Sequence, residues 1–264
     1  MKKYFQIFKI SWQQNLTYRL NFILWRIRTI LQLLLVYFIW WTVFQTQANL
    51  FGYTKSLILT YILVAALIRV IVLSTRVTDL INQINDGSVV NFIVKPLGFI
   101  RYYLSVDFAD KIFNILFFVF EIIILFIFFK PPLIIQTNIF TVGLFLLAIA
   151  AGLLIYFCIN LLISLSSFWT ENSWGPLFLM TIILEGFGGG LFPIDILPKN
   201  IFNILMLTPF PYLIYFPAKI YLGTMPVHEI LFGFMTVSVW GIVLIMLMQK
   251  MIKVGFKHFS AVGN

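Results

Sequence analysis

The chain has 264 residues, of which 61% are hydrophobic and 10% are charged, and its formal net charge is +9. In a soluble domain about a quarter of the residues are charged, so this composition excludes a soluble globular protein and indicates an integral membrane protein. The positive charge is typical of cytoplasmic loops, whose Lys and Arg side chains interact with anionic headgroups. We therefore expect membrane lipid, and not nucleic acid, as the partner of these basic residues.

Residues 1–28 are predicted to form an amphipathic helix that lies in the membrane interface. Apolar residues recur at steps of three and four, which place them on one helix face; they are Phe5, Phe8, Trp12, Leu16, Leu20 and Ile23. Arg26 and Arg28 mark the point where the chain is expected to turn into the membrane. The helix would act either as an anchor that sets the topology or as an element that transmits force.

Six segments are apolar and long enough to cross a hydrocarbon core of ~30 Å: 29–46, 56–74, 111–129, 138–165, 176–192 and 227–249. The predicted fold is therefore an all-α integral membrane protein, with six transmembrane helices in a single domain over residues 1–264. An even number of spans places both termini on one side. Most Lys and Arg residues, including Lys111, fall on that side and a minority, including Lys219, on the other, which predicts cytoplasmic termini.

The longest loop on the cytoplasmic side, residues 76–105, contains a predicted short helix. Thr78 is a candidate N-cap, Asp79 lies in the first turn, and Gly87 is expected to end the helix. A Lys-Pro pair further along is expected to interrupt helical structure before the third span. The helix either rests on the bilayer or docks a cytoplasmic protein, because its apolar stripe needs a partner; the stripe consists of Leu80, Ile81 and Ile84.

The segment 186–225 is apolar, yet it cannot form one straight helix. It carries five prolines, each of which interrupts helical hydrogen bonding: Pro193, Pro198, Pro209, Pro211 and Pro217. We expect the segment to break, turn and re-enter the membrane on the outer side. Irregular backbone persists at membrane depth only where protein buries it or where it lines a watery path. This pattern favours a transport protein over a simple anchor.

Three ionisable residues lie within the predicted spans, where a central charge costs about 2.5–3.5 kcal/mol. Arg69 is close enough to a span end to snorkel. Glu121 is near the middle of the third span and should face another helix, with Arg69 as a depth-mismatched candidate partner. Glu185 precedes the glycine-rich run Gly186–Gly190. That run is a hinge, a site of close backbone approach, or simply a helix end near water. In the first two cases Glu185 would be a candidate cargo contact or gate.

The sequence gives no sign of catalytic chemistry on this chain. The dipeptide Gly-Lys does not occur, so the end of a P-loop phosphate cradle is missing and ATP hydrolysis is not expected here. The two histidines, His228 and His258, are too few for a histidine-rich metal cluster and are predicted to lie far apart. We therefore expect no catalytic residue, no metal site and no cofactor bound to this chain.

The order of these elements resembles the permease subunits of ABC-2-type exporters, in particular a small bacterial branch in which two permease genes accompany one ATPase gene. Two stretches carry the resemblance: INDGSVVNFIVKPLGFIRYY from Ile84, and LFPIDILPKNIFNILMLTPFPYLIYFPAKIYLG from Leu191. The resemblance implies a multi-pass protein of the bacterial inner membrane. It would move an amphipathic small molecule, peptide or lipid outward by alternating access.

The resemblance also implies partners and site residues. Two copies of an ATPase subunit, which carries the ATP and Mg, and a second identical or related permease would complete the transporter. The loop helix would be the coupling helix, with ATPase-coupling residues Thr78, Asp79, Leu80, Ile81, Ile84, Asp86, Gly87 and Pro96. The segment 193–225 would form outer re-entrant helices. Candidate pathway or gate residues are Tyr37, Trp41, Arg69, Glu121, Glu185, Gly188, Pro193, Pro209 and Pro211.

An ion-coupled secondary transporter or a channel is the alternative function. Secondary carriers usually contain two repeated halves with interrupted helices in both. In this sequence only the second half carries a proline-broken segment. The pattern therefore favours an exporter subunit that takes its energy from a separate ATPase.

Overall fold

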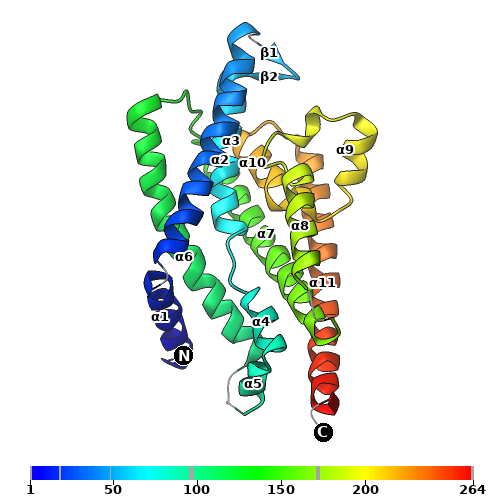
Figure 1. Ribbon diagram of the computed structural model, residues 1–264. Coiled ribbons are helices and arrows are strands. Elements are labelled where there is room, and N and C mark those ends of the chain that lie inside the picture. Colours follow the sequence, from blue (N-terminus) through cyan, green and yellow to red (C-terminus); the bar gives the residue numbers. More distant parts are fainter. Residues whose placement is uncertain (1, 18, 48, 95–97, 171–172, 263–264) are drawn as a thin grey trace.

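The computed structural model describes residues 2–17, 19–47, 49–94, 98–170 and 173–262 (Figure 1). The first half contains the helices α1 (Lys2–Thr17), α2 (Arg19–Thr46), α3 (Lys55–Val72), α4 (Asp79–Asn85), η1 (Ser88–Val90), α5 (Asn91–Val94) and α6 (Phe99–Phe129). The second half contains α7 (Ile139–Leu165), η2 (Ser166–Phe168), α8 (Trp174–Phe187), η3 (Ile194–Ile196), α9 (Lys199–Leu205), η4 (Phe210–Leu213), α10 (Tyr215–Leu222) and α11 (Val227–Val262). Helices therefore dominate, and a small antiparallel hairpin of β1 (Asn49–Leu50) and β2 (Tyr53–Thr54) joins α2 to α3.

Five helices in the described part of the chain are long and apolar enough to cross a membrane: Phe22–Thr46, Lys55–Val72, Phe99–Phe129, Ile139–Phe168 and Val227–His258. The predicted span 176–192 corresponds to α8, which has 14 residues. A helix of this length extends about 21 Å, less than the ~30 Å of a hydrocarbon core. The protein is thus an all-helical membrane protein with five candidate spans, and the sixth span stays a prediction.

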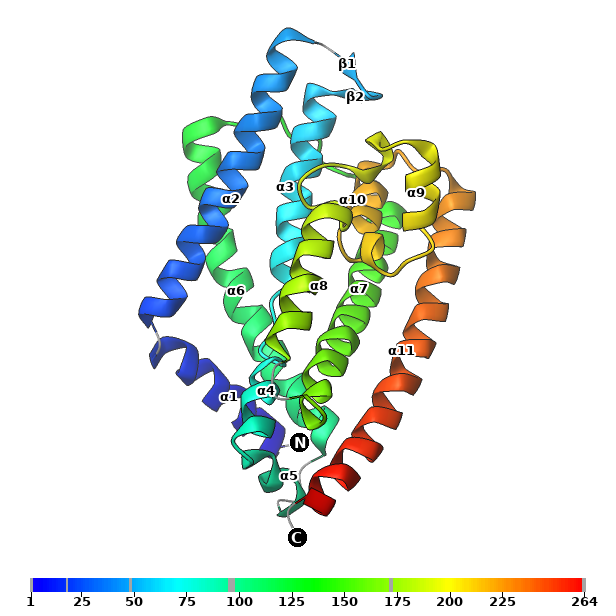
Figure 2. The same ribbon diagram turned by 45° about the vertical axis from the view of Figure 1, so that its right-hand side comes forward.

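The long helices form an elongated bundle with two distinct ends (Figures 1 and 2). The terminal end holds the start of α1, the end of α11, and the short helices α4 and α5. The opposite end, called the distal end below, holds the β1–β2 hairpin and α9. The centre of the bundle is α3, since 61% of its apolar window is buried, against 17–39% in the other four candidate spans.

The N-terminal boundary predicted at residue 28 is wrong. The helix α1 ends at Thr17 and α2 begins at Arg19, so residues 19–28 form the first turns of α2. The helix α1 is packed along α6, where the Trp12 and Phe113 rings meet edge to face with 5.1 Å between centroids. The predicted boundary is too late because Arg26 and Arg28 were expected to mark a turn, whereas they belong to the first turns of the long helix.

The third span also begins earlier than predicted. The helix α6 starts at Phe99, so the last part of the predicted loop 76–105 is helical. The side chains of Asp107 and Lys111, one helical turn apart, pair within this helix with 3.4 Å between Lys111 Nζ and Asp107 Oδ2. Both are buried, and Lys111, expected at the start of the third span, lies three turns inside α6.

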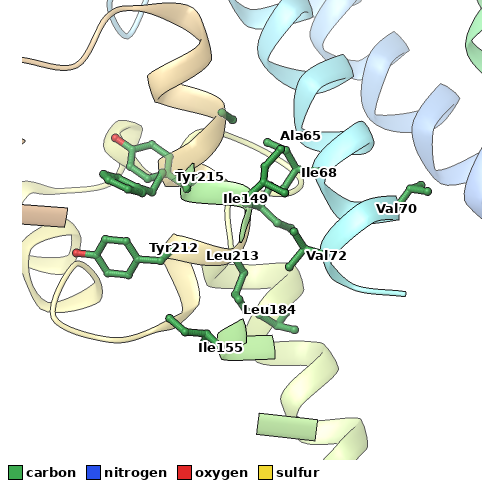
Figure 3. Close-up of a cluster of buried hydrophobic side chains, with 14 of the residues drawn as sticks. Ala65, Ile68, Val70, Val72, Ile149, Ile155, Leu184, Tyr212, Leu213 and Tyr215 are labelled. Carbon is green, nitrogen blue, oxygen red and sulfur yellow. The ribbon is translucent and has the colours of Figure 1, made fainter. Parts of the chain in front are cut away.

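The proline-rich segment forms four short helices instead of one straight helix, as its prolines predict. Pro193, Pro198 and Pro209 each stand directly before one of them. Residues 211–220 are all buried. In Figure 3, Tyr212 and Leu213 lie beside Ile149 and Ile155 of α7, and Val72 of α3 is close by. The broken backbone is thus covered by protein, which is the condition for irregular structure at membrane depth.

Candidate functional site

The short helix α4 forms at the terminal end, but its apolar stripe packs inward. Leu80 and Ile81 are fully buried and Ile84 is 5% exposed, and α4 contacts α7 and η2. Tyr103 of α6 fixes the helix further by donating a hydrogen bond to Gln83 Oε1 at 2.5 Å. The predicted need for a partner is therefore met within the chain, since the stripe contacts neither the bilayer nor a docked protein.

The ends of α4 agree only in part with the sequence prediction. Gly87 follows the helix with a φ of +78°, a left-handed conformation that suits glycine, as expected of a helix stop. Asp79 lies in the first turn and accepts hydrogen bonds from the Arg76 guanidinium at 3.0 and 3.2 Å. Thr78 has helical backbone angles and makes no side-chain cap, so its predicted role as N-cap is wrong. Pro96 lies outside the described residues.

The outward face of α4 is polar. Asn82, Asn85 and Asp86 are exposed. Asp86 Oδ1 accepts a hydrogen bond from the backbone N–H of Ser88 at 2.9 Å. Hydrogen bonding from the side chain and backbone of Ser88 holds the pKa of Asp86 below its usual range. The surface that α4 offers to another molecule is therefore short, hydrogen-bonding and anionic.

A partly buried polar cluster joins α2, α3 and α8. Arg69 and Glu185 form a bidentate ion pair, in which Arg69 Nη2 lies 2.9 Å from Glu185 Oε2 and Nη1 pairs with Oε1. Gln32 of α2 donates to both Glu185 oxygens at 3.2 Å. Arg69 therefore does not snorkel to a span end, and Glu185 does not stand alone at the end of its helix. The cluster borders a small cavity lined by Thr29, Gln32, Leu33, Val36, Ile62, Ala66, Arg69, Phe118 and Gly190.

The glycine-rich run after Glu185 makes a close backbone approach, one of the interpretations left open by the sequence. Gly188 O accepts a hydrogen bond from the Tyr215 backbone N–H at 3.0 Å. Gly189 has a φ of +86°, and its carbonyl accepts from Tyr61 Oη at 2.6 Å. A Cβ on Gly190 would overlap the Arg69 guanidinium. These glycines are packed inside the protein, so α8 does not simply end near water.

The predicted partner of Glu121 is wrong. Glu121 of α6 pairs with Arg26 of α2, whose Nε lies 2.6 Å from Glu121 Oε1 and whose Nη2 pairs with Oε2. Each side chain is 9% exposed. Arg69 is already engaged by Glu185, so Glu121 and Glu185 each pair with a different arginine. Sequence reasoning missed Arg26 because it was assigned to the turn before the first span; continuing the helix periodicity through residue 28 would have placed it on α2.

The remaining pathway candidates are packed into the fold. Tyr37 is 1% exposed and stacks on Trp41 with 6.0 Å between ring centroids. The Lys55 ammonium lies over the Trp41 ring at 3.6 Å. Pro193, Pro209 and Pro211 are also buried, as is Gly188. None of these residues lines the small cavity beside Arg69, and their role in a pathway stays a prediction.

A second ionic cluster, at the distal end, was missed by the sequence reasoning. Lys219 of α10 pairs with Asp195 of η3 at 2.9 Å, and Tyr53 of β2 donates to Asp195 at 2.9 Å. Burial, followed by the neighbouring Asp195 carboxylate, raises the pKa of Tyr53 well above its usual range. The cluster ties the β1–β2 hairpin to the proline-rich segment. The charge distribution predicts only that Lys219 lies on the outer side, and nothing in its local sequence indicates these partners.

Comparison with known proteins gives one match. The profile of a family described as ABC-2 family transporter protein matches residues 30–263, which include the second part of α2 and every later helix of the described chain. No curated protein matches the chain, and no solved structure matches it.

Proposed function

Since this chain belongs to the ABC-2 transporter family, we propose that it is the permease subunit of an ATP-driven exporter that moves an amphipathic small molecule, peptide or lipid out of the cytoplasm. A separate ATPase supplies the energy. The observation that carries this proposal is α4, a short helix whose apolar side is satisfied within the chain and whose polar side faces outward at the terminal end.

The terminal end faces the cytoplasm in this proposal, and the protein is a multi-pass component of the bacterial inner membrane. Two features support the orientation. Both ends of the chain lie at the terminal end (Figure 1). The basic residues of the N-terminal helix and of the last turns of α11, such as Lys3, Lys9, Lys253 and Lys257, fall at the same end, as the positive-inside rule requires.

In the working topology, α8 completes a sixth crossing. The chain returns from the terminal end through α8, next to α7, and continues at the distal end as η3 and α9 (Figure 2). The glycine turn and the short helices after it extend the crossing beyond the length of α8 itself. The segment 193–225 then acts as a re-entrant cap at the outer end of the pathway, supported by the complete burial of residues 211–220.

The ATPase contact consists of the exposed side chains of α4. Asn82, Asn85 and Asp86 provide hydrogen-bond donors, acceptors and one negative charge. The buried stripe residues and Gly87 set the position of the helix and its end instead of touching the partner. Two ATPase copies bind ATP and Mg, and a second permease, identical or related, completes the assembly.

Arg69 and Glu185 form the gate of the pathway in this proposal. Their ion pair holds α3 and α8 together at a point where Gln32 of α2 also converges. Separating two charges at membrane depth is costly unless another group replaces the lost partner. A cargo with a cationic group would supply such a replacement for Glu185, so opening would depend on cargo or on force from the ATPase.

The test is capture of the ATPase by a tagged chain extracted gently from native membranes. We expect a P-loop ATPase to co-purify with the parent chain. Asp86→Lys should lower the recovery, because it reverses the charge of the proposed contact. Glu229→Lys reverses an exposed charge at the other end of the bundle and should leave recovery unchanged. Repeated failure of the parent chain to recover an ATPase would refute the proposal.

An ion-coupled secondary transporter or channel is the second candidate, and the two intramembrane ion pairs are the observation that favours it. Ionisable residues within spans mark ion pathways in many carriers. Solute movement by the purified chain in vesicles, without ATPase or ATP, would establish this function. An exporter subunit alone should be inactive in the same vesicles.

A further inference from the structure

The connection between α3 and α4 is a short strap, residues 73–78, with no regular helix or strand. If the ATPase pushes on α4, this strap is the covalent route from the contact to α3. An irregular strap transmits displacement poorly unless other contacts hold it, because each residue retains soft backbone dihedrals. The side chains that hold the strap therefore decide where the displacement goes.

Lys111 of α6 holds the strap where it leaves α3. Its ammonium donates to the Val72 carbonyl at 3.2 Å and to the Ser74 carbonyl, and it pairs with Asp107. The last carbonyls of a helix lack intrahelical partners and carry partial negative charge, so a lysine is a suitable group to satisfy them. A helix that is separate in sequence thus caps α3 at its junction with the strap.

A second contact attaches α4 itself to the same helix. Tyr103 of α6 donates its hydroxyl hydrogen bond to Gln83 of α4, and Tyr103 is 1% exposed. Tyr103 and Lys111 lie about two helical turns apart, or ~12 Å. Two attachment points fix both the position and the direction of the strap and α4 relative to α6. One point alone would leave α4 able to pivot.

The opposite part of α6 is joined to α2 through the Arg26–Glu121 pair, and Asn114 accepts a further, longer hydrogen bond from Arg26 at 3.4 Å. Polar contacts thus run from α4 to α6 and from α6 to α2. Displacement of α4 can therefore reach α2 without passing through the covalent strap.

On these grounds we infer that Lys111 is a positioning residue that makes α4 and α6 move as one body. Burying an ammonium and a carboxylate is costly, and replacing both with apolar groups is often neutral or stabilising, so stability alone does not explain the pair. A better-documented role of such buried pairs is to fix the position of one structural element relative to another. The inference rests on the proposed function, because it assumes an ATPase acting at α4.

The experiment uses the full chain in complex with a hydrolysis-deficient ATPase in lipid nanodiscs. Cys158 is the single cysteine, so Cys158→Ala allows spin labels at two chosen exposed positions, Val90→Cys in η1 and Phe128→Cys near the end of α6. Pulsed electron paramagnetic resonance then measures the distance between the two spin labels with and without ATP. In the labelled parent, ATP should leave this distance unchanged, because α4 and α6 move together.

Lys111→Met should separate the two elements without removing the exposed face of α4. The variant should still capture the ATPase, but ATP should now shift the distance by more than the width of the parent distribution. Lys111→Arg should behave as the parent, since a guanidinium can still donate to the carbonyls. If Lys111→Met does not assemble, the double variant Lys111→Met/Asp107→Leu removes both charges and should show the same shift.

The matched control is Lys219→Met, which removes another buried, ion-paired lysine at the distal end. It should leave the distance unaffected by ATP. The inference is overturned if ATP shifts the distance in the parent, if it leaves the distance unchanged in Lys111→Met or, where that variant does not assemble, in Lys111→Met/Asp107→Leu, or if it shifts the distance equally in the control. Failure of the parent to capture any ATPase would instead refute the proposed function, and the inference with it, before any distance is measured.

Discussion

The ion pair between Arg69 and Glu185 should contribute measurably to stability, and a double-mutant cycle can isolate its contribution. Glu185→Gln preserves the shape of the side chain but leaves the Arg69 charge without its counter-ion. Arg69→Met leaves the carboxylate in the same position without its partner. The double variant Arg69→Met/Glu185→Gln leaves neither charge, so it should recover most of the stability lost in either single variant.

The magnitude follows from burial. Removing one member of a fully buried pair costs ~3–5 kcal/mol. The Arg69 and Glu185 side chains are 17% and 28% exposed, so we expect each single variant to lose about 2–3 kcal/mol, below that range. The coupling energy of the cycle should be of similar size, because the geometry is bidentate and Gln32 holds the carboxylate in place.

The assay is equilibrium unfolding by titration with sodium dodecyl sulfate in mixed micelles, followed by tryptophan fluorescence. The matched control is the cycle Arg76→Met with Asp79→Asn, an ion pair whose side chains are 23% and 47% exposed. Pairs of this kind couple by less than about 1 kcal/mol. Additive effects at Arg69 and Glu185, equal to those of the control, would refute the reasoning that burial makes this pair strong.

Three further predictions follow from other contacts. Gly190→Ala should destabilise the protein by about 1–3 kcal/mol, because the new Cβ overlaps Arg69; the same titration measures it, and Gly143→Ala, where a Cβ meets no atom within 4 Å, is the control. Glu121→Gln should reduce assembly and expression by leaving Arg26 unpaired, and unchanged expression, assembly and transport would reject any essential role for the Glu121 charge. Tyr53→Phe removes a hydroxyl that both donates to Asp195 and accepts from Lys219. The free energy of unfolding should fall by about 1–3 kcal/mol, and proteolysis of the β1–β2 hairpin should increase. A hairpin as resistant to proteolysis as that of the parent would contradict this.

Much of the fold follows from local sequence. Hydropathy locates the five candidate spans to within a helical turn or so at one or both ends, because a long apolar run has few alternatives in a protein of this composition. Prolines correctly predict the broken segment, and Gly87 correctly predicts the end of α4, since both residues act through their own backbone. These features depend on short stretches that can be read without knowing the tertiary structure.

The pairing of charges could not be read in this way. Arg26 and Glu121 are 95 positions apart in the chain, and Arg69 and Glu185 are 116 apart. Which acid meets which arginine depends on the relative depth and rotation of helices, both of which are set by packing. The burial of the α4 stripe is similar: periodicity shows that Leu80, Ile81 and Ile84 share a face, but not that α7 covers that face.

The buried stretch 211–220 has a consequence for biogenesis. Much of its docking surface is built from α3 and α7, which leave the ribosome before the stretch is synthesised (Figure 3). None of these residues has an exposed side chain in the folded protein, so the finished fold leaves the stretch no contact with lipid. A nascent chain arrested before residue 211 would present an apolar slot ready for occupation, and completing synthesis would close that slot with the chain's own next residues.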